Sequence, residues 1–169
     1  IAMKKVSPET RITPQEPIQQ LLGKLKEKMK LVYHQRGDIS EYSKQRGIAP
    51  FALREIMSVN PLSIGIPKEY GGRGAIMSEN LALLETASYE SLALSLTFGI
   101  NSALFLQPVG KYALNEAKSD VFKRFMEQQN MGGLMITEPD FGSDALNMQT
   151  FFKENQDAFH LQGKKHWAG

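Results

Sequence analysis

Cysteine is absent from the 169 residues, and neither sign of charge dominates. The lack of cysteine excludes a disulfide scaffold, thiolate catalysis and a cysteine-ligated metal site, and it fits a cytoplasmic protein. The 20 basic and 18 acidic residues leave a net charge of +2, too balanced for the basic stripe of a nucleic-acid or membrane-surface binder. We therefore predict a cytoplasmic, globular protein without a nucleic-acid partner.

Long hydrophobic runs are scarce as well. The opening stretch IAMKKVSPETR has basic residues but no apolar segment of the kind that makes a secretory signal. The segment from Ser91 to Gly110 carries no charge, yet it includes Asn101, Gln107 and Pro108. A membrane-spanning helix rarely carries so many polar groups and breaks. We interpret this segment as buried helices, broken near Gly99 and Pro108, and predict no membrane span.

Familiar catalytic and metal-binding motifs are also missing. The sequence has no Gly-x-Ser-x-Gly nucleophile motif, no phosphate loop and no dinucleotide fingerprint. Its three histidines, His34, His160 and His166, lack the spacing of metal ligands. No pattern pairs the candidate carboxylates, which are Glu69, Glu85, Glu90 and Glu138. These residues predict neither a metal site nor a self-contained catalytic apparatus.

Apolar residues at helical spacing occupy most of the chain. Residues 1–16 read as an extended arm, and residues 17–132 read as an α-helical domain. Helices are predicted over 17–36, 39–45, 50–58, 78–91, 92–113 and 120–130. The stretch from Ile64 to Gly74 is a glycine-rich connector. The helix that begins at Ser78 is expected to bury Leu81, Leu84 and either Ala87 or Ser88. The last helix is expected to bury Val121, Phe122, Phe125 and Met126.

After Gly133 the pattern changes to that of strands. Leu134 to Thr137 is a short apolar run, and the sequence from Thr150 onward reads as two strands around a polar turn at 155–157, with a further strand near Lys165. So few residues cannot close a sheet around a core. We predict an α+β chain in which an all-α N-terminal bundle precedes the beginning of a β domain, residues 133–169.

A dense polar turn follows the first predicted strand. Thr137-Glu138-Pro139 and Gly142-Ser143-Asp144 place hydroxyls beside the free backbone groups of a strand end, and Gly142 permits a sharp reversal. That combination suits a flat ligand rimmed by carbonyls and ring nitrogens. The alternative is a capped loop in which Ser143 and Asp144 satisfy their own backbone.

Trp167 is the only tryptophan of the chain. Its indole offers a large aromatic face on which a ligand ring can stack. A single tryptophan near a strand also serves to pack a hydrophobic core, so the sequence leaves both roles open.

Four stretches together resemble the acyl-CoA dehydrogenase family. They are IGIPKEYGGRG, ENLALLETASYES, MITEPDFGSD and FHLQGKKHW, and their order and separations match from about Pro50 to Trp167. The resemblance implies a helical N-terminal domain, a central antiparallel β-barrel and a C-terminal four-helix bundle, with FAD between the barrel and the bundle. The β-barrel would begin in residues 133–169 and be incomplete there.

The implied activity is the FAD-dependent oxidation of the α,β bond of an acyl-CoA thioester, a reaction of fatty acid metabolism. The family's catalytic glutamate lies in the C-terminal part, so no catalytic residue is assigned to this chain. The implied partners are acyl-CoA, an electron-transfer flavoprotein or another electron acceptor, and further copies of the chain in a homodimer or homotetramer.

Carried over residue by residue, the resemblance assigns a set of cofactor contacts. The implied FAD-binding residues are Leu134, Met135, Ile136, Thr137, Gly142, Ser143, Trp167 and Gly169. Thr137 would add its hydroxyl at the pyrimidine end of the flavin, and Ser143 would contact both FAD and acyl-CoA. Trp167 would stack near the isoalloxazine ring.

The sequence departs from the family pattern at two places. Ala168 and Gly169 stand where the family has Ile and then Thr or Ser, so Gly169 keeps a backbone N–H but lacks the hydroxyl that reaches flavin N5. Asp140 stands where Gly is common. The missing hydroxyl leaves open a flavin-dependent monooxygenase or oxidase of the same fold. A flavin-free helical interaction module is a separate alternative, which the presence of Thr137, Ser143 and Trp167 disfavours.

Overall fold

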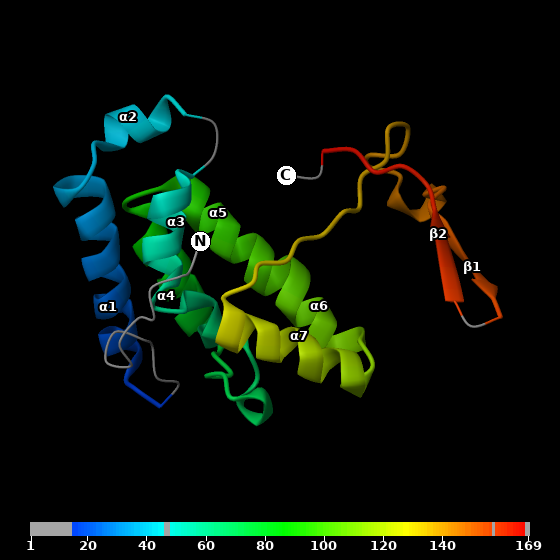
Figure 1. The fold of residues 1–169 in the computed structure, drawn as a ribbon, viewed down its shortest axis with the longest axis horizontal. Coiled ribbons are helices and arrows are strands. Elements are labelled where there is room, and N and C mark those ends of the chain that lie inside the picture. The colour runs from blue at the N-terminus through cyan, green and yellow to red at the C-terminus, as the bar shows by residue number, and fades with distance from the viewer. Residues whose placement is uncertain (1–14, 46–47, 157, 168–169) are drawn as a thin grey trace. The chain divides into compact units, whose positions relative to one another are not determined.

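A computed structural model of the protein describes residues 15–45, 48–156 and 158–167, and the chain divides into two compact units after Gly132 (Figure 1). The first unit is helical. The second contains a small two-stranded antiparallel sheet, so the α+β prediction is confirmed. The expected arm over residues 1–16 lies outside the described residues, apart from Gln15 and Glu16.

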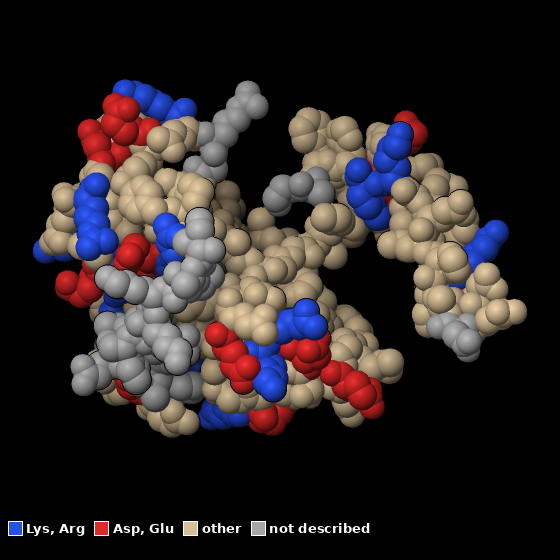
Figure 2. Space-filling view, in the orientation of Figure 1, with Lys and Arg blue, Asp and Glu red and all other residues tan. Residues whose placement is uncertain are grey.

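The helical unit is built from seven α-helices and four shorter helical turns within the described residues. The α-helices are α1 (Ile18–Lys30), α2 (Ile39–Ser43), α3 (Pro50–Met57), α4 (Met77–Ser88), α5 (Leu92–Gly99), α6 (Gln107–Tyr112) and α7 (Asn115–Gln128). The short turns are η2 (Leu31–Gln35), η3 (Pro61–Gly65), η4 (Lys68–Tyr70) and η5 (Ile100–Leu106). Figure 2 shows basic and acidic side chains interspersed on the face of this unit in view.

The core of the helical unit follows the predicted apolar stripe of α1. Leu21, Leu25 and Met29 are fully buried, at the spacing that places them on one face. Each such side chain contributes roughly 1.5–3 kcal/mol when it leaves water. The helix then widens into the π-helical turn η2, in which Arg36 N donates to Leu31 O at 2.9 Å. The predicted helix over 17–36 is therefore confirmed, with this change of winding near its end.

The buried face of α4 differs from the prediction. Ala87 is buried, as predicted, but the leucine that is buried with it is Leu83, whereas Leu81 is 56% exposed and Leu84 is half-buried. Both sets of residues fit a helical period, and the sequence did not show which face packs on α1. The helix also begins at Met77, one residue before the predicted start at Ser78.

The charge-free segment forms one continuous helical stretch through α5, η5 and α6. The expected breaks near Gly99 and Pro108 do not occur. A proline ring clashes with the carbonyl four residues before it in a regular helix, and the wider π-helical turn η5 precedes Pro108 here. The prediction of burial holds for one face only: Phe98 is fully buried, and Leu92 is 68% exposed.

This stretch, Leu92–Tyr112, is long and apolar enough to cross a membrane by length and composition, and 33% of its most apolar window is buried. Core helices of soluble proteins pass the same test, so the absence of a membrane span stays a prediction.

The last helix begins earlier than the sequence indicates. α7 starts at Asn115, four residues before the expected cap at Ser119. Its Phe122 and Phe125 are buried as predicted, and Val121 and Met126 are half-buried.

The glycine-rich connector contains the end of the short turn η3 and all of the short turn η4. It contains no α-helix, as predicted. Gly71 and Gly74 have φ values of 84° and 62°, which glycine adopts without strain. A Cβ atom on Gly72 would overlap the carbonyl of Ile66. The connector therefore requires glycine for both conformation and close packing.

The second unit contains the turn η6 (Ala145–Asn147) and a hairpin of β1 (Phe151–Asn155) and β2 (Ala158–Gln162). The register pairs Phe151 with Gln162 and Asn155 with Ala158, which confirms the two predicted strands and their polar turn. Leu134–Thr137 and the stretch near Lys165 are not strands in the described structure. A strand needs neighbours along its length, and a single backbone bond joins these two stretches.

Replacing Gly72 with alanine tests the connector. We expect Gly72→Ala to lower the free energy of unfolding by roughly 1–3 kcal/mol, because its Cβ must displace the Ile66 backbone. Gly23→Ala is the matched control, since Gly23 lies inside α1 with open space around it, and it should stabilise the protein by about 0.5–1 kcal/mol. Urea unfolding measures both. Equal midpoints for Gly72→Ala and the wild type would contradict the prediction.

Candidate functional site

The predicted site residues fall on two stretches of the second unit, 134–143 and 163–167. The backbone N–H of His166 donates to the carbonyl of Thr137 at 2.9 Å. This bond places Thr137 beside the residue that precedes Trp167. Gly169 lies outside the described residues.

A tight reversal follows Thr137. Glu138 and Phe141 exchange two backbone hydrogen bonds, of 3.4 and 3.2 Å, around Pro139 and Asp140. This hydrogen-bonded reversal comes before Gly142, which itself lies in a bend of the chain with open space around it.

The capped-loop alternative is not seen at Asp144 or at Ser143, because neither side chain hydrogen-bonds to the backbone of the described loop. The backbone carbonyl of Asp144 accepts a hydrogen bond from the backbone N–H of Asn147, and the Asp144 carboxylate accepts one from the Asn147 side-chain amide. Ser143 is exposed, and no described residue hydrogen-bonds to its hydroxyl. Ser143 is therefore available to a ligand.

Glu138 is the most constrained side chain of the second unit. It is 4% exposed and accepts three hydrogen bonds, from the backbone N–H groups of Gln149 (2.6 Å) and Thr150 (2.8 Å) and from the ammonium of Lys165 (3.0 Å). A buried carboxylate is stable only when paired in this way. Glu138 thus ties the Thr137 stretch to two others.

Lys165 completes the arrangement. Its ammonium also donates to the carbonyl of Ile136 at 3.0 Å and lies 3.3 Å from the sulfur of Met148. We call Glu138 and Lys165, with the contacts just described, the Glu138–Lys165 clamp. The clamp spans 27 residues of sequence and joins the two stretches that hold the predicted site.

Gly163 allows the second stretch to approach this closely. Its φ is 150°, a conformation that side-chain-bearing residues rarely adopt, and a Cβ atom there would lie 2.7 Å from Cα of Thr150. Any larger residue would push the two backbones apart.

The surroundings of Glu138 favour its charged form. The Thr150 side chain, the backbone N–H groups of Gln149 and Thr150 and the Lys165 ammonium together lower the pKa of Glu138 to about 2, against the opposing effect of burial. The clamp therefore contains an ionised carboxylate at neutral pH.

The edge formed by Leu134–Thr137 has a definite hydrogen-bonding polarity at its Ile136–Thr137 end, whereas the carbonyls of Leu134 and Met135 accept from no described donor. The carbonyls of Ile136 and Thr137 are occupied by Lys165 and His166. The N–H groups of the four residues donate to no described acceptor, and the Leu134, Met135 and Ile136 side chains are 43–64% exposed. The edge thus offers backbone donors and apolar surface to a ligand.

Trp167 lies at the end of the other stretch with its indole 85% exposed. It packs into no core of the described residues. Its φ of 56° is uncommon for a residue with a side chain. Such strain is found where a side chain must be presented in a fixed direction.

Comparison with known proteins identifies the first unit. A family model described as "Acyl-CoA dehydrogenase, N-terminal domain" matches residues 32–129, more than half of the chain. The chain belongs to the acyl-CoA dehydrogenase family. The predicted resemblance is therefore confirmed.

The similar proteins differ in what their names say they do. Mitochondrial isovaleryl-CoA dehydrogenase of Bos taurus is 27% identical over 114 residues, covering 68% of this chain and 27% of the relative. A 3-sulfinopropanoyl-CoA desulfinase of Paraburkholderia xenovorans is 29% identical over 106 residues, covering 63% and 27%. The chain thus spans about a quarter of the length of these relatives.

The fold is shared with solved structures. An acyl-CoA dehydrogenase from Bacillus anthracis, complexed with FAD, superposes with a TM-score of 0.71 at 20% identity, covering 97% of this chain and 29% of the other. This match extends the family's fold across nearly the whole chain.

The clamp of this acyl-CoA dehydrogenase homologue was missed by sequence reasoning. Glu138 was noted as an unpaired carboxylate, and Lys165 was given no role. The sequence signal that could have indicated this pair was the opposite charge of Glu138 and Lys165, which lie in two motifs of the same family. The sequence also does not predict the pairing of His34 with Glu90, whose Nε2 and Oε2 atoms lie 2.6 Å apart.

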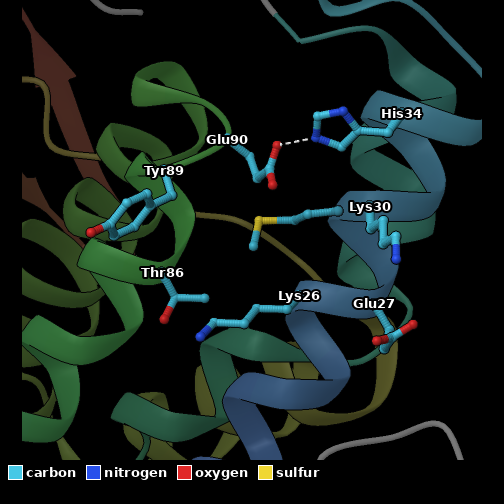
Figure 3. A pocket seen from close by; sticks show the side chains of 8 residues that line it. Lys26, Glu27, Lys30, His34, Thr86, Tyr89 and Glu90 are labelled. Atoms are coloured by element: carbon cyan, nitrogen blue, oxygen red, sulfur yellow. Dashed lines mark hydrogen bonds and ion pairs between the residues drawn. The ribbon is translucent and has the colours of Figure 1, made fainter.

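The helical unit carries a separate groove of about 500 Å³ between α1 and α4. Figure 3 shows Lys26 reaching toward Thr86 across it and the His34–Glu90 pair closing one end. None of the predicted site residues lines the groove. Among the described residues no group of three His, Asp or Glu side chains could hold a metal ion.

Acid should loosen the clamp. The pKa of Glu138 falls from 4.5 to about 2 on folding, so its ionised form stabilises the second unit fully above pH 4.5, and that contribution is lost as the pH falls toward 2. We expect amide exchange at Gln149 and Thr150, normalised for its intrinsic pH dependence, to accelerate across this range. Glu138→Gln should remove most of the pH dependence.

Asp140→Asn is the matched control, since Asp140 is exposed at the tip of the reversal. It should keep the wild-type pH profile. A Glu138→Gln variant with the same normalised profile as the wild type would show that the carboxylate does not brace this unit.

Proposed function

We propose that this chain supplies the helical domain and part of the flavin edge of an FAD-dependent acyl-CoA dehydrogenase, which oxidises the α,β bond of an acyl-CoA thioester. One observation carries the proposal: backbone donors at Leu134–Thr137 and the exposed indole of Trp167 belong to two stretches that are hydrogen-bonded together. Family membership and the FAD of the Bacillus anthracis relative support it.

The residues present fit a flavin. The pyrimidine part of the ring system presents carbonyl oxygens, which need donors, and one N–H, which needs an acceptor. Leu134–Thr137 offers unoccupied N–H groups and, at Leu134 and Met135, unoccupied carbonyls. The hydroxyls of Thr137 and Ser143 add two adjustable partners, and Trp167 offers a face for stacking. When bound, the flavin would supply the hydride-accepting chemistry, and these residues would bind and orient it.

The described residues do not provide a catalytic base for this reaction. Glu138 is the carboxylate nearest to the proposed edge, and its charge is held by Lys165 and two backbone N–H groups. A general base needs a pKa near the working pH, and the pKa of Glu138 is about 2. We assign Glu138 to the support of the edge and name no catalytic residue.

The wider setting is also part of the proposal. We propose acyl-CoA as substrate, with Ser143 as one of its contacts, and an electron-transfer flavoprotein or another acceptor as the oxidant. A homodimer or homotetramer and a cytoplasmic location complete it.

A second candidate is another flavin-dependent reaction on the same fold, such as that of an oxidase or monooxygenase. Gly169 stands in place of the hydroxyl-bearing residue that the family pattern has near flavin N5. A similar protein is named as a desulfinase, so relatives of this chain are not restricted to dehydrogenation by name. A flavin-free interaction module is disfavoured by the unpaired donors and the exposed indole.

The test uses the intact protein. A bound yellow flavin that bleaches when acyl-CoA is added without oxygen supports the dehydrogenase. Bound flavin without bleaching, over a series of acyl chain lengths, favours the second candidate. Colourless protein that does not take up added FAD would reject both flavin-dependent functions.

Trp167→Ala should weaken FAD binding in the intact protein. Loss of aromatic stacking costs about 1 kcal/mol, which corresponds to roughly a fivefold rise in Kd. Tyr89→Ala is the control, because Tyr89 is 83% exposed but lies on the helical unit. Titration of apoprotein with FAD measures both, and an unchanged Kd for Trp167→Ala would remove the indole from the site.

A further inference from the structure

The ligand-facing groups of the second unit depend on charged side chains that do not themselves face the ligand. The hairpin cannot hold them, because every described residue of β1 and β2 is exposed. Thr137 directly precedes Glu138, and Trp167 follows Lys165 by two residues. The clamp is thus adjacent in sequence to both proposed flavin contacts.

We infer that Glu138 and Lys165 are positioning residues for the isoalloxazine, which they serve by holding the Thr137 and Trp167 stretches at one spacing and by setting the polarity of the edge. The inference rests on the proposed function. The family resemblance implied flavin contacts for Thr137 and Trp167 only. The inference adds Glu138 and Lys165 as residues that position those contacts.

The polarity argument concerns Lys165. Its ammonium occupies the carbonyl of Ile136, and the next residue, His166, occupies the carbonyl of Thr137. With these two acceptors filled, the Ile136–Thr137 end of the edge presents N–H donors to a ligand, which match acceptor atoms of a ring. Loss of the ammonium would free the Ile136 carbonyl and turn an acceptor toward the same space.

The spacing argument concerns Glu138. Its buried carboxylate holds Gln149, Thr150 and Lys165 at 2.6–3.0 Å, so two other segments converge on one side chain. Gly163 lets the segment of Lys165 lie against Thr150. Removing either charge leaves the other poorly paired, because the Lys165 side chain is only 21% exposed.

The chain supplies a matched control. Lys164 carries the same charge one residue earlier, is exposed, and has no hydrogen bond or ion pair within the described residues. Lys165→Met and Lys164→Met therefore remove the same charge from the same stretch, and only the first breaks the clamp. Lys165→Arg keeps the charge and can restore the pairing with Glu138.

The experiment has one arm without flavin. Hydrogen exchange of segments 148–150 and 163–167 is measured in the intact apoprotein by mass spectrometry. We expect at least tenfold faster exchange in Lys165→Met and Glu138→Gln, and wild-type exchange in Lys164→Met. Helices α1 and α4 should keep wild-type exchange in every variant, which shows that the protein is folded. Unchanged exchange in Lys165→Met would overturn the inference whatever flavin does.

The second arm measures the Kd for FAD and the visible absorption bands of the bound flavin. We expect Lys165→Met to raise Kd about tenfold and to shift the bands, Lys164→Met to change neither, and Lys165→Arg to recover most of the affinity. If the wild-type protein binds no FAD, both the proposed function and the role of Glu138 and Lys165 in positioning the flavin are overturned. Wild-type affinity and spectrum in Lys165→Met, with the wild type yellow, overturn this inference alone.

Discussion

The buried carboxylate of Glu138 is the constraint on which the second unit depends. A two-stranded hairpin has no interior of its own, and all described residues of β1 and β2 are exposed. Order must then come from polar contacts, and Glu138 accepts hydrogen bonds from three groups on two other segments. An ionised carboxylate in a dry position is costly unless every such contact is made, which makes its geometry strict.

The helical unit is organised by packing instead, and the difference explains what the sequence could predict. Leu21, Leu25 and Met29 lie one helical turn apart and are buried, so periodicity alone located α1 and its inner face. In α4 the same reasoning chose Leu81, and the structure buries Leu83. A helix with leucines on two faces has no single apolar stripe, and its partner decides which face is covered.

The candidate site shows the same limit of sequence-based prediction, here for contacts between residues far apart in the sequence. The order of the motifs brought Thr137 and Trp167 into one prediction, and the structure joins their stretches through the bond between His166 and Thr137. The support was not visible, because Glu138 and Lys165 are 27 residues apart and neither charge is unusual where it stands. The third strand near Lys165 was wrong for a related reason: strand propensity is local, whereas a strand exists only through its neighbours.

The hydrogen-bonding groups of the Leu134–Thr137 edge suggest how one fold can serve different reactions. Groups that offer donors and an aromatic face select a ring system by its hydrogen-bonding rim, and they do not select the bond that is broken. The similar proteins carry names of both dehydrogenases and a desulfinase. In this chain the carboxylate nearest the edge has its charge fully engaged by Lys165 and backbone N–H groups, so it is unsuited to proton transfer at neutral pH. Under the proposed function, the second unit would hold a ring in place, and the specificity of the reaction would come from groups that meet the substrate.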